Sequence, residues 1–236
     1  MTTATLPETT RLDAGAALGR AMRQVFAFLR DNPTFTAGLA LLLALYLFGV
    51  IGSSVISPRR ADMGGNPLNL SPSWDHPLGT DGLGRDMLAV MVIGIPNTVK
   101  IGFLAGAVGV GIGALMGLFA GYYKGIANSI LSSFADVMLV IPTLAILITV
   151  SAYVRVVTVE IMAVIVGLLA WPLPARVIRS QTLSLRERLF VQVAKLSGEN
   201  DLEIITLRIL PNLTAYLAAS FVGAVSGGIL ASVGLE

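Results

Sequence analysis

The only histidine of the chain lies in the segment that offers the most obvious candidates for chemistry. His76 follows Asp75, and Asp81 and Asp86 come shortly after it. Imidazole and carboxylate groups build hydrolase triads and metal sites. These residues have neither a fixed ligand spacing nor a paired nucleophile, so we predict no catalytic residue and no metal site. We instead expect Asp81, Arg85 and Asp86 to fix a loop through hydrogen bonds.

Nucleotide-binding motifs are absent from the sequence or occur in the wrong context. The chain has no G-x-x-x-x-G-K-[ST] sequence, so it is not expected to bind ATP through a P-loop. Gly109, Gly111 and Ala114 match G-x-G-x-x-A, but no strand precedes them and they lie in a long apolar run. No cofactor is expected on this chain, and the energy for an active process must come from elsewhere.

Asp136 is the ionisable residue nearest to the interior of an apolar run, and such residues are candidates for a transport function. Its place near the end of the run and its closeness in sequence to Lys124 favour capping or interface pairing over a proton relay. Pro142 is expected to kink the same run, because proline lacks an N–H donor and crowds the preceding turn.

The composition indicates that membrane helices position these residues. Of the 236 residues, 55% are hydrophobic and only 13% are charged, whereas a soluble domain carries about 25% charged residues. Mean hydropathy is +0.80. The net charge of +2 comes from dispersed basic residues, so nucleic-acid binding is not predicted. The absence of cysteine excludes disulfides and thiolate sites.

Five apolar runs are long enough to cross a bilayer and predict an all-α polytopic membrane protein. They cover residues 32–58, the run between Lys100 and Lys124, residues 136–154, residues 156–175, and the run after Arg208. The predicted organisation is an N-terminal segment (1–31), a first transmembrane helix (32–58), a loop (59–98) and a core (99–236) that contains the polar segment 185–212.

The distribution of Lys and Arg predicts the orientation of the chain in the membrane. With a cytoplasmic N-terminus, eleven of the sixteen basic residues fall inside: Arg11, Arg20, Arg23, Arg30, Lys124, Arg176, Arg179, Arg186, Arg188, Lys195 and Arg208. The five outside are Arg59, Arg60, Arg85, Lys100 and Arg155. We therefore expect loop 59–98 outside and segment 185–212 in the cytoplasm.

Glycines at helical spacing predict close contacts between the membrane helices. Gly109, Gly113, Gly117 and Gly121 recur every four residues and line one helical face, which lets a neighbouring backbone approach closely. Gly223 and Gly227 repeat the pattern in the fifth run. We expect both faces to pack against protein.

The segment "LRERLFVQVAKLSGENDLEIITLRILPN", residues 185–212, is a polar, soluble-looking helical segment between two apolar stretches. Leu189, Val193 and Leu196 follow helical spacing, with Phe190 and Ala194 beside them. Gly198 permits a bend, and the spacing of Asn200 and Glu203 matches a capping box that begins a second helix, which ends or kinks near Pro211. The pattern fits a helix on the lipid surface or a docking element for a cytoplasmic partner.

This segment resembles the EAA loop of ABC-importer permeases, especially that of the C-type subunits of peptide permeases. The shared pattern is L-R-x-R, an aromatic residue, a glycine four residues after the last alanine, then I-I and I-L-P-N. Gln192 and Val193 depart from the E-A-A core, whereas Ala194 and Gly198 fit it. "HPLGTDGLGRD" (76–86) and "GYYKGIANSILSSFADVMLVIPTLAILITV" (121–150) also resemble family segments.

The resemblance implies a permease subunit in the inner (plasma) membrane that is not itself an enzyme. Its partners would be a second permease subunit, cytoplasmic ATPase subunits that hold ATP and Mg, an extracytoplasmic solute-binding protein, and lipid. The residues implied in ATPase coupling are Phe190, Gln192, Ala194, Lys195, Gly198 and Asp201. Di- or oligopeptides are the first expected substrates, with oligosaccharides or nickel complexes as alternatives. The family's usual sixth helix has no counterpart before Glu236.

A secondary transporter or channel is the alternative from another class. It would need coupling ions or a polar pore, and apolar runs this poor in ionisable groups offer little for proton coupling. A membrane scaffold without a transport role is a second alternative. Co-purification with ATPase subunits would separate these possibilities.

Overall fold

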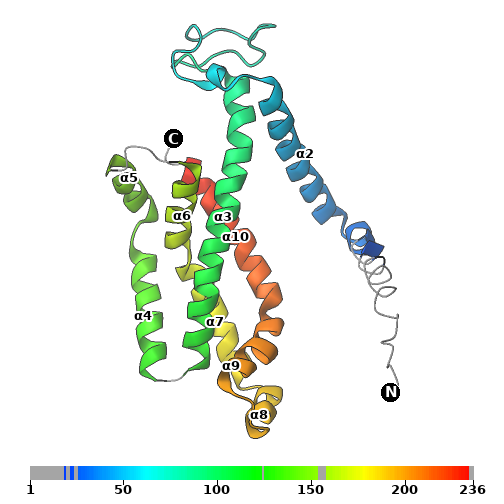
Figure 1. Ribbon diagram of the computed structural model, residues 1–236, viewed down its shortest axis with the longest axis vertical. Coiled ribbons are helices and arrows are strands. Elements are labelled where there is room, and N and C mark those ends of the chain that lie inside the picture. The colour runs from blue at the N-terminus through cyan, green and yellow to red at the C-terminus, as the bar shows by residue number, and fades with distance from the viewer. Residues whose placement is uncertain (1–18, 20–21, 24–25, 124, 154–157, 234–236) are drawn as a thin grey trace, which may run out of the picture. The chain divides into compact units, whose positions relative to one another are not determined.

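The structure is a computed structural model that describes residues 19, 22–23, 26–123, 125–153 and 158–233 (Figure 1). Within these residues the regular structure is helical, with one isolated β-bridge between Thr80 and Asp86. The predicted all-α class is therefore confirmed. The chain divides into two units, 1–93 and 94–236, and the long helix α3 (Met87–Tyr122) begins in the first unit and continues in the second.

The first unit contains the helix α2 (Pro33–Val55), which corresponds to the first predicted membrane run. Pro33 is suited to the first helical position, because its missing N–H would have no partner there. The apolar side chains of α2 point to all sides of the helix, and Gly49 is its only buried residue. A helix that is apolar all round suits a lipid environment. A short 3₁₀ turn, η2 (Pro58–Ala61), follows it.

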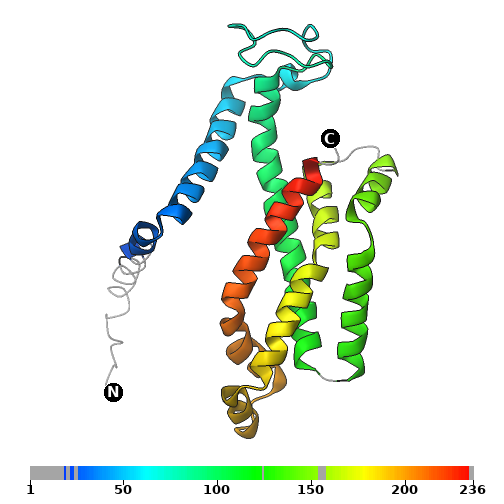
Figure 2. The ribbon, with the colours of Figure 1, turned by 180° about the vertical axis from the view of Figure 1, so that it is seen from behind.

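The second unit is a bundle of helices whose order along the chain is the same as that of the predicted runs. After α3 come α4 (Ile126–Val140), α5 (Thr143–Tyr153), α6 (Val159–Ala170), α7 (Pro172–Arg186), α8 (Leu189–Leu196), α9 (Asp201–Glu203), the π-helical turn η3 (Ile204–Ile209), the 3₁₀ turn η4 (Leu210–Leu213) and α10 (Thr214–Val233). Figure 2 shows α8 and α9 at one end of this bundle and the last turn of α10 at the other.

Among the described residues, three helices are long and apolar enough to cross a membrane: α2, α3 and the stretch Asp201–Val233. The number rises to five if the bent pairs α4–α5 and α6–α7 each count as one span. The bend between α4 and α5 is 73° and lies at Pro142, which confirms the predicted kink. The bend between α6 and α7 is 42° and precedes Pro172.

Several helix boundaries differ from those predicted. α3 begins at Met87, so residues 87–98 are helical although the sequence assigned them to the loop. α4 begins at Ile126, and α7 continues to Arg186. A run without charges marks only the apolar part of a helix, whereas caps and neighbouring side chains decide where the helix ends. Lys100, for example, lies inside α3 and forms an ion pair with Glu160 on α6.

The glycine face of α3 packs against α6 and α7, as predicted. A Cβ atom on Gly113 would lie 2.8 Å from the carbonyl oxygen of Trp171, and one on Gly117 would lie 2.7 Å from that of Ala175. Gly109 and Gly121 approach the same pair of helices on either side of these contacts. The absence of side chains therefore lets the helix backbones approach directly.

The matching prediction for α10 is wrong within this chain. A Cβ atom on Gly223 or Gly227 would meet no atom within 4 Å. Both glycines instead line an open groove between α10 and the helices α4 to α7. On the side of α10 that contacts α3, the neighbouring Gly228 lies against Ala105 and Gly102.

Candidate functional site

The polar segment between α7 and α10 forms two short helical pieces, as predicted. α8 ends at Leu196 with Ser197 as its C-cap, and Gly198 adopts a φ of 83°, a conformation that L-residues with side chains rarely adopt. Asn200 then caps α9 by accepting from the backbone N–H of Glu203, and the Glu203 carboxylate accepts from the N–H of Asn200. We call residues 189–203 the α8–α9 element.

The exposed side of α8 is the apolar stripe that the sequence predicts. Leu189, Val193 and Leu196 are 74%, 51% and 89% exposed. The helix is anchored instead through Val191 and Ala194, which are almost completely buried. α8 therefore presents large apolar side chains outward, which favours a partner surface over solvent.

A hydrophobic core beneath α8 supports this arrangement. Val191 and Ala194 pack with Tyr122 and Leu118 from the end of α3, Ile178 from α7, and residues of the following turns. The members from those turns are Ile204, Ile205, Ile209 and Leu213. The core joins α3, α7, α8 and η3. Because these elements are closely packed, a displacement of α8 would act on several helices at once.

Five of the six residues implied in coupling fall into two groups. Phe190, Gln192 and Gly198 are exposed, and Gln192 donates to the Glu187 carbonyl oxygen at 3.1 Å. Lys195 and Asp201 contact Tyr122 within the chain: the Lys195 ammonium lies 4.8 Å from the ring centroid, and Asp201 accepts a hydrogen bond from the hydroxyl.

Ala194 does not belong to an outward docking face. It is 4% exposed and lies in the internal core, because α8 rests on the side that carries Val191 and Ala194. A charge at this position would be buried in apolar surroundings and would destabilise the chain itself.

Sequence reasoning missed Tyr122 and Arg186 as part of this site. The Arg186 side chain is 9% exposed and its guanidinium donates to the carbonyl oxygens of Gly121 and Tyr122 at 3.1 and 3.0 Å. Those carbonyls lie at the end of α3, where a helix leaves acceptors without internal partners. The signal in the sequence was the pair Tyr122 and Tyr123, directly after the last glycine of the ladder. Asp201, the partner of Tyr122, lies 79 residues further along the chain.

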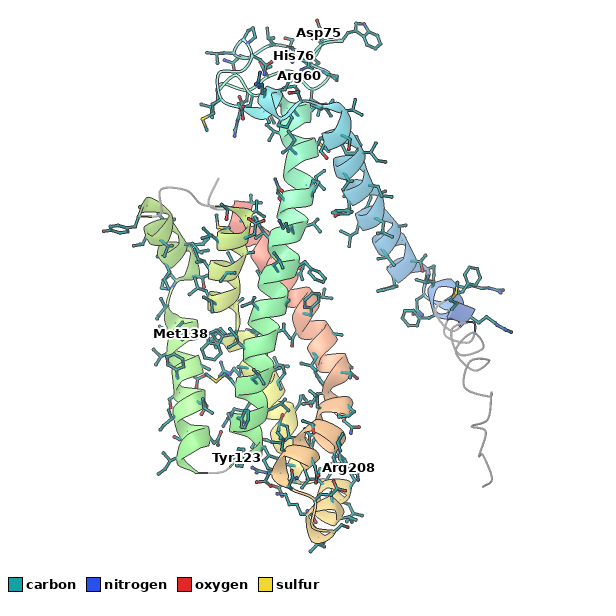
Figure 3. All side chains as sticks on the ribbon, in the orientation of Figure 1. Arg60, Asp75, His76, Tyr123, Met138 and Arg208 are labelled. Carbon is teal, nitrogen blue, oxygen red and sulfur yellow. The ribbon has the colours of Figure 1, made fainter. Side chains whose placement is uncertain are left out.

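An ion pair connects the α8–α9 element to η3. Arg208 donates to both carboxylate oxygens of Glu199, at 3.1 and 2.5 Å. This hydrogen bond holds the pKa of the Glu199 carboxyl below its ordinary value. Figure 3 shows Arg208 at the same end of the bundle as Tyr123. Arg208 lies within the π-helical turn η3, a form that occurs often at functional sites.

An open groove of about 720 Å³ lies on one side of the second unit. It is lined mainly by apolar and small side chains of α4 to α7 and α10, and Thr143, Tyr216 and Ser220 supply its hydroxyl groups. No charged residue lines it among the described residues. Such a surface suits contact with another apolar chain or passage of a substrate without a fixed charge partner.

The residues around His76 fix a loop, as predicted. Asp86 is 1% exposed and pairs with His76 Nδ1 at 2.9 Å, while its other oxygen accepts from the backbone N–H groups of Leu88 and Ala89. Arg85 donates to Asp81 at 2.8 Å. Figure 3 shows Arg60 and His76 in this loop. No group of three potential metal ligands occurs among the described residues.

Asp136 forms an ion pair at 3.9 Å with Arg176 on α7, and both side chains are more than half exposed. Of the two roles predicted, capping or interface pairing, the structure shows a pairing, and the partner lies on another helix of the same chain. Lys124, its partner suggested by the sequence, lies outside the described residues. Arg179 makes a second link between the same helices by donating to Asn128 at 2.7 Å.

Comparison with known proteins identifies the family. The family described as binding-protein-dependent transport system inner membrane component matches residues 113–236. The oligopeptide transport system permease protein OppC of Mycobacterium bovis is 30% identical over 89% of this chain and 72% of that protein. The dipeptide transport system permease protein DppC of Alkalihalophilus pseudofirmus is 30% identical over 82% of the chain and 63% of that protein. The glutathione transport system permease protein GsiD of Pectobacterium atrosepticum is 30% identical over 89% of the chain and 69% of that protein. The chain belongs to the family of inner membrane components of binding-protein-dependent transport systems.

Proposed function

We propose that this chain is a permease subunit through which an ATP-driven importer carries di- or oligopeptides across the membrane. The substrate class is supported by the relatives, whose names specify oligopeptides, dipeptides and glutathione. All of these are short peptides. Oligosaccharides and nickel complexes find no support in these names.

The observation that carries the proposal is the exposed apolar side of α8 above a buried core. Leu189, Val193 and Leu196 point away from the chain, while Val191 and Ala194 hold the helix against α3 and α7. A lipid-surface helix would show the same exposure, but it would not need contacts to several membrane helices. The contacts fit an element that receives a force from a cytoplasmic ATPase subunit and passes it inward.

The other partners follow from the same assembly. A second permease subunit would cover the apolar groove, whose small residues Gly223 and Gly227 permit close helix contact. ATP and Mg would be held by the ATPase subunits, and a solute-binding protein would deliver the peptide from outside. Within the second unit, Arg186, Arg188, Lys195 and Arg208 belong to the segment around α8, which supports a cytoplasmic location for that end.

The secondary-transporter alternative has less support. The ion pairs described in the second unit join neighbouring elements, as Lys100 with Glu160 and Asp136 with Arg176, and none of these residues lines the groove. Proton coupling would require ionisable groups along the substrate route.

Co-purification and uptake in reconstituted vesicles test the proposal. We expect wild-type complexes to take up labelled di- and tripeptides only with ATP and binding protein. Leu196→Glu should reduce ATPase association on the order of ten-fold, because it places a charge in the apolar docking face. Gln192→Glu is the matched control, since it adds the same charge on α8 at the position where the family has Glu. Peptide uptake without ATPase subunits would contradict the proposal.

A further inference from the structure

Tyr122 is the last residue of α3, and its hydroxyl donates a hydrogen bond to a residue that is distant in the sequence. The Oη atom donates to Asp201 Oδ1 at 2.5 Å, and the side chain is 4% exposed. Asp201 is the first residue of α9, directly after the Gly198 bend and the Asn200 cap. A single polar bond therefore joins the end of a membrane helix to the α8–α9 element.

Two basic side chains surround the same tyrosine. The Lys195 ammonium lies over the ring, within the range of a cation–π contact. Arg186 donates to the carbonyl oxygens of Gly121 and Tyr122, which end α3. α7, α8 and α9 therefore all hold this one helix end, and charged groups strengthen each contact.

Because Tyr122 lies at the end of α3, a movement of Tyr122 would be passed to the helices that pack against α3. The adjacent Gly121 and the rest of the glycine ladder lie close against backbone and Cβ atoms of α6 and α7. Residues of α6 and α7 in turn line the open groove. Close-packed helices shift as units, so displacement of the end of α3 changes the walls of the groove.

We propose that Tyr122 is a positioning residue that transmits movement of the α8–α9 element to α3 through its hydroxyl bond to Asp201. This inference rests on the proposed function, because the movement originates in an ATPase subunit bound to α8. In this scheme Tyr122 contacts neither that subunit nor the substrate. It determines how much of the movement of the α8–α9 element reaches the membrane helices.

A purely structural role for Tyr122 predicts a different response to mutation. The ring already packs in the core with Val191 and Ile204, and phenylalanine would keep that packing. Tyr122→Phe removes only the hydroxyl. Tyr123→Phe is the matched control, because Tyr123 is the adjacent, more exposed tyrosine and its hydroxyl makes no hydrogen bond within the described part of the chain.

The test measures ATP-driven peptide uptake and ATP hydrolysis in reconstituted complexes of wild type, Tyr122→Phe, Tyr123→Phe, Asp201→Asn and Asp201→Ala. We expect Tyr122→Phe and Asp201→Ala to lower peptides transported per ATP on the order of ten-fold at unchanged ATPase association. Asp201→Asn keeps an acceptor oxygen and should restore much of the ratio. The double variant Tyr122→Phe/Asp201→Ala should be no worse than either single variant.

Wild-type coupling in Tyr122→Phe would overturn the inference. Loss of ATPase association in Tyr122→Phe would also overturn it, because the hydroxyl would then hold the docking site and not transmit its movement. Amide hydrogen exchange of residues 189–203 in the purified protein provides an independent measurement, with faster exchange expected in Tyr122→Phe and not in Tyr123→Phe. This arm tests whether the hydroxyl bond holds the α8–α9 element even if wild type fails to associate with an ATPase, a result that would contradict the proposed function instead.

Discussion

At the scale of single residues, Gly198 is required by its backbone conformation and not by lack of space. Its φ is 83°, and a Cβ atom would meet nothing within 4 Å. Asparagine tolerates this region better than other residues, whereas β-branched residues are strongly disfavoured there. The bend between α8 and α9 therefore depends on a residue that accepts a left-handed conformation.

Gly198→Val should destabilise this bend by about 1–2 kcal/mol. Membrane insertion should be retained, while ATPase association or coupled peptide uptake falls. Gly198→Asn is the control and should keep most of the activity. Equal uptake by the two variants would show that the positive φ has no role in coupling.

The Asp86 carboxyl ties the polar loop of the first unit together. Burial raises its pKa, but hydrogen bonds from His76 and from the N–H groups of Ala89 and Leu88 more than offset this and hold the pKa below its ordinary value. A carboxyl with a lowered native pKa stabilises the fold above its unfolded pKa of about 3.9, and this contribution is lost as the pH falls through the native value.

We therefore expect amide exchange in residues 60–89 to accelerate, relative to the intrinsic rate, when the pH falls below about 4. Asp86→Asn should weaken this acid response, because the amide does not titrate. Asp75→Asn changes an exposed carboxyl in the same loop and serves as the control. A response of the same size in Asp86→Asn and wild type would contradict the assignment.

At the scale of elements, the contact of α3 with α6 and α7 depends on the missing side chains of its glycine face. Gly113 and Gly117 meet backbone atoms, which cannot move aside as a flexible side chain can. Gly111 lies on the same helix but faces open space. The two faces of one helix therefore predict opposite tolerances to larger residues.

Gly113→Leu should cost at least about 1–3 kcal/mol of stability, because the added side chain forces the helices apart. A lower melting temperature and a lower yield in detergent are expected. Gly111→Leu introduces the same residue two positions away and should leave both nearly unchanged. If both variants melt like wild type, the glycine ladder does not hold this contact.

At the scale of the whole molecule, the proposed orientation places the α8–α9 element in the cytoplasm and the loop of the first unit outside. Ser197 and Trp74 are exposed positions in these two segments, and the chain has no cysteine of its own. Single cysteines at the two sites therefore report the orientation without interference.

We expect an impermeant thiol reagent to label Trp74→Cys in intact cells and Ser197→Cys only after the membrane is opened. The charge distribution is the physical reason, since basic residues near helix ends are retained on the cytoplasmic side. Labelling of Ser197→Cys in intact cells would reverse the orientation and with it the site of ATPase docking.

The sequence by itself determined the membrane class, the order of the helical runs, the Pro142 kink, the α3 glycine face and the bend at Gly198. Each of these depends on local chemistry: apolar length, proline geometry, residue spacing or a capping box. The resemblance of segment 185–212 to a family motif led to the correct family. Such a motif depends only on residues that are close together in the sequence.

Only the tertiary structure decided which side of α8 faces outward, why Ala194 is buried, and that Gly223 and Gly227 line an open groove. An apolar stripe on a helix indicates a contact but does not specify whether the contact lies within the chain or with a partner. Tyr122 and Asp201 are 79 residues apart in sequence, so their hydrogen bond exists only once α3 and the α8–α9 element pack around the same core.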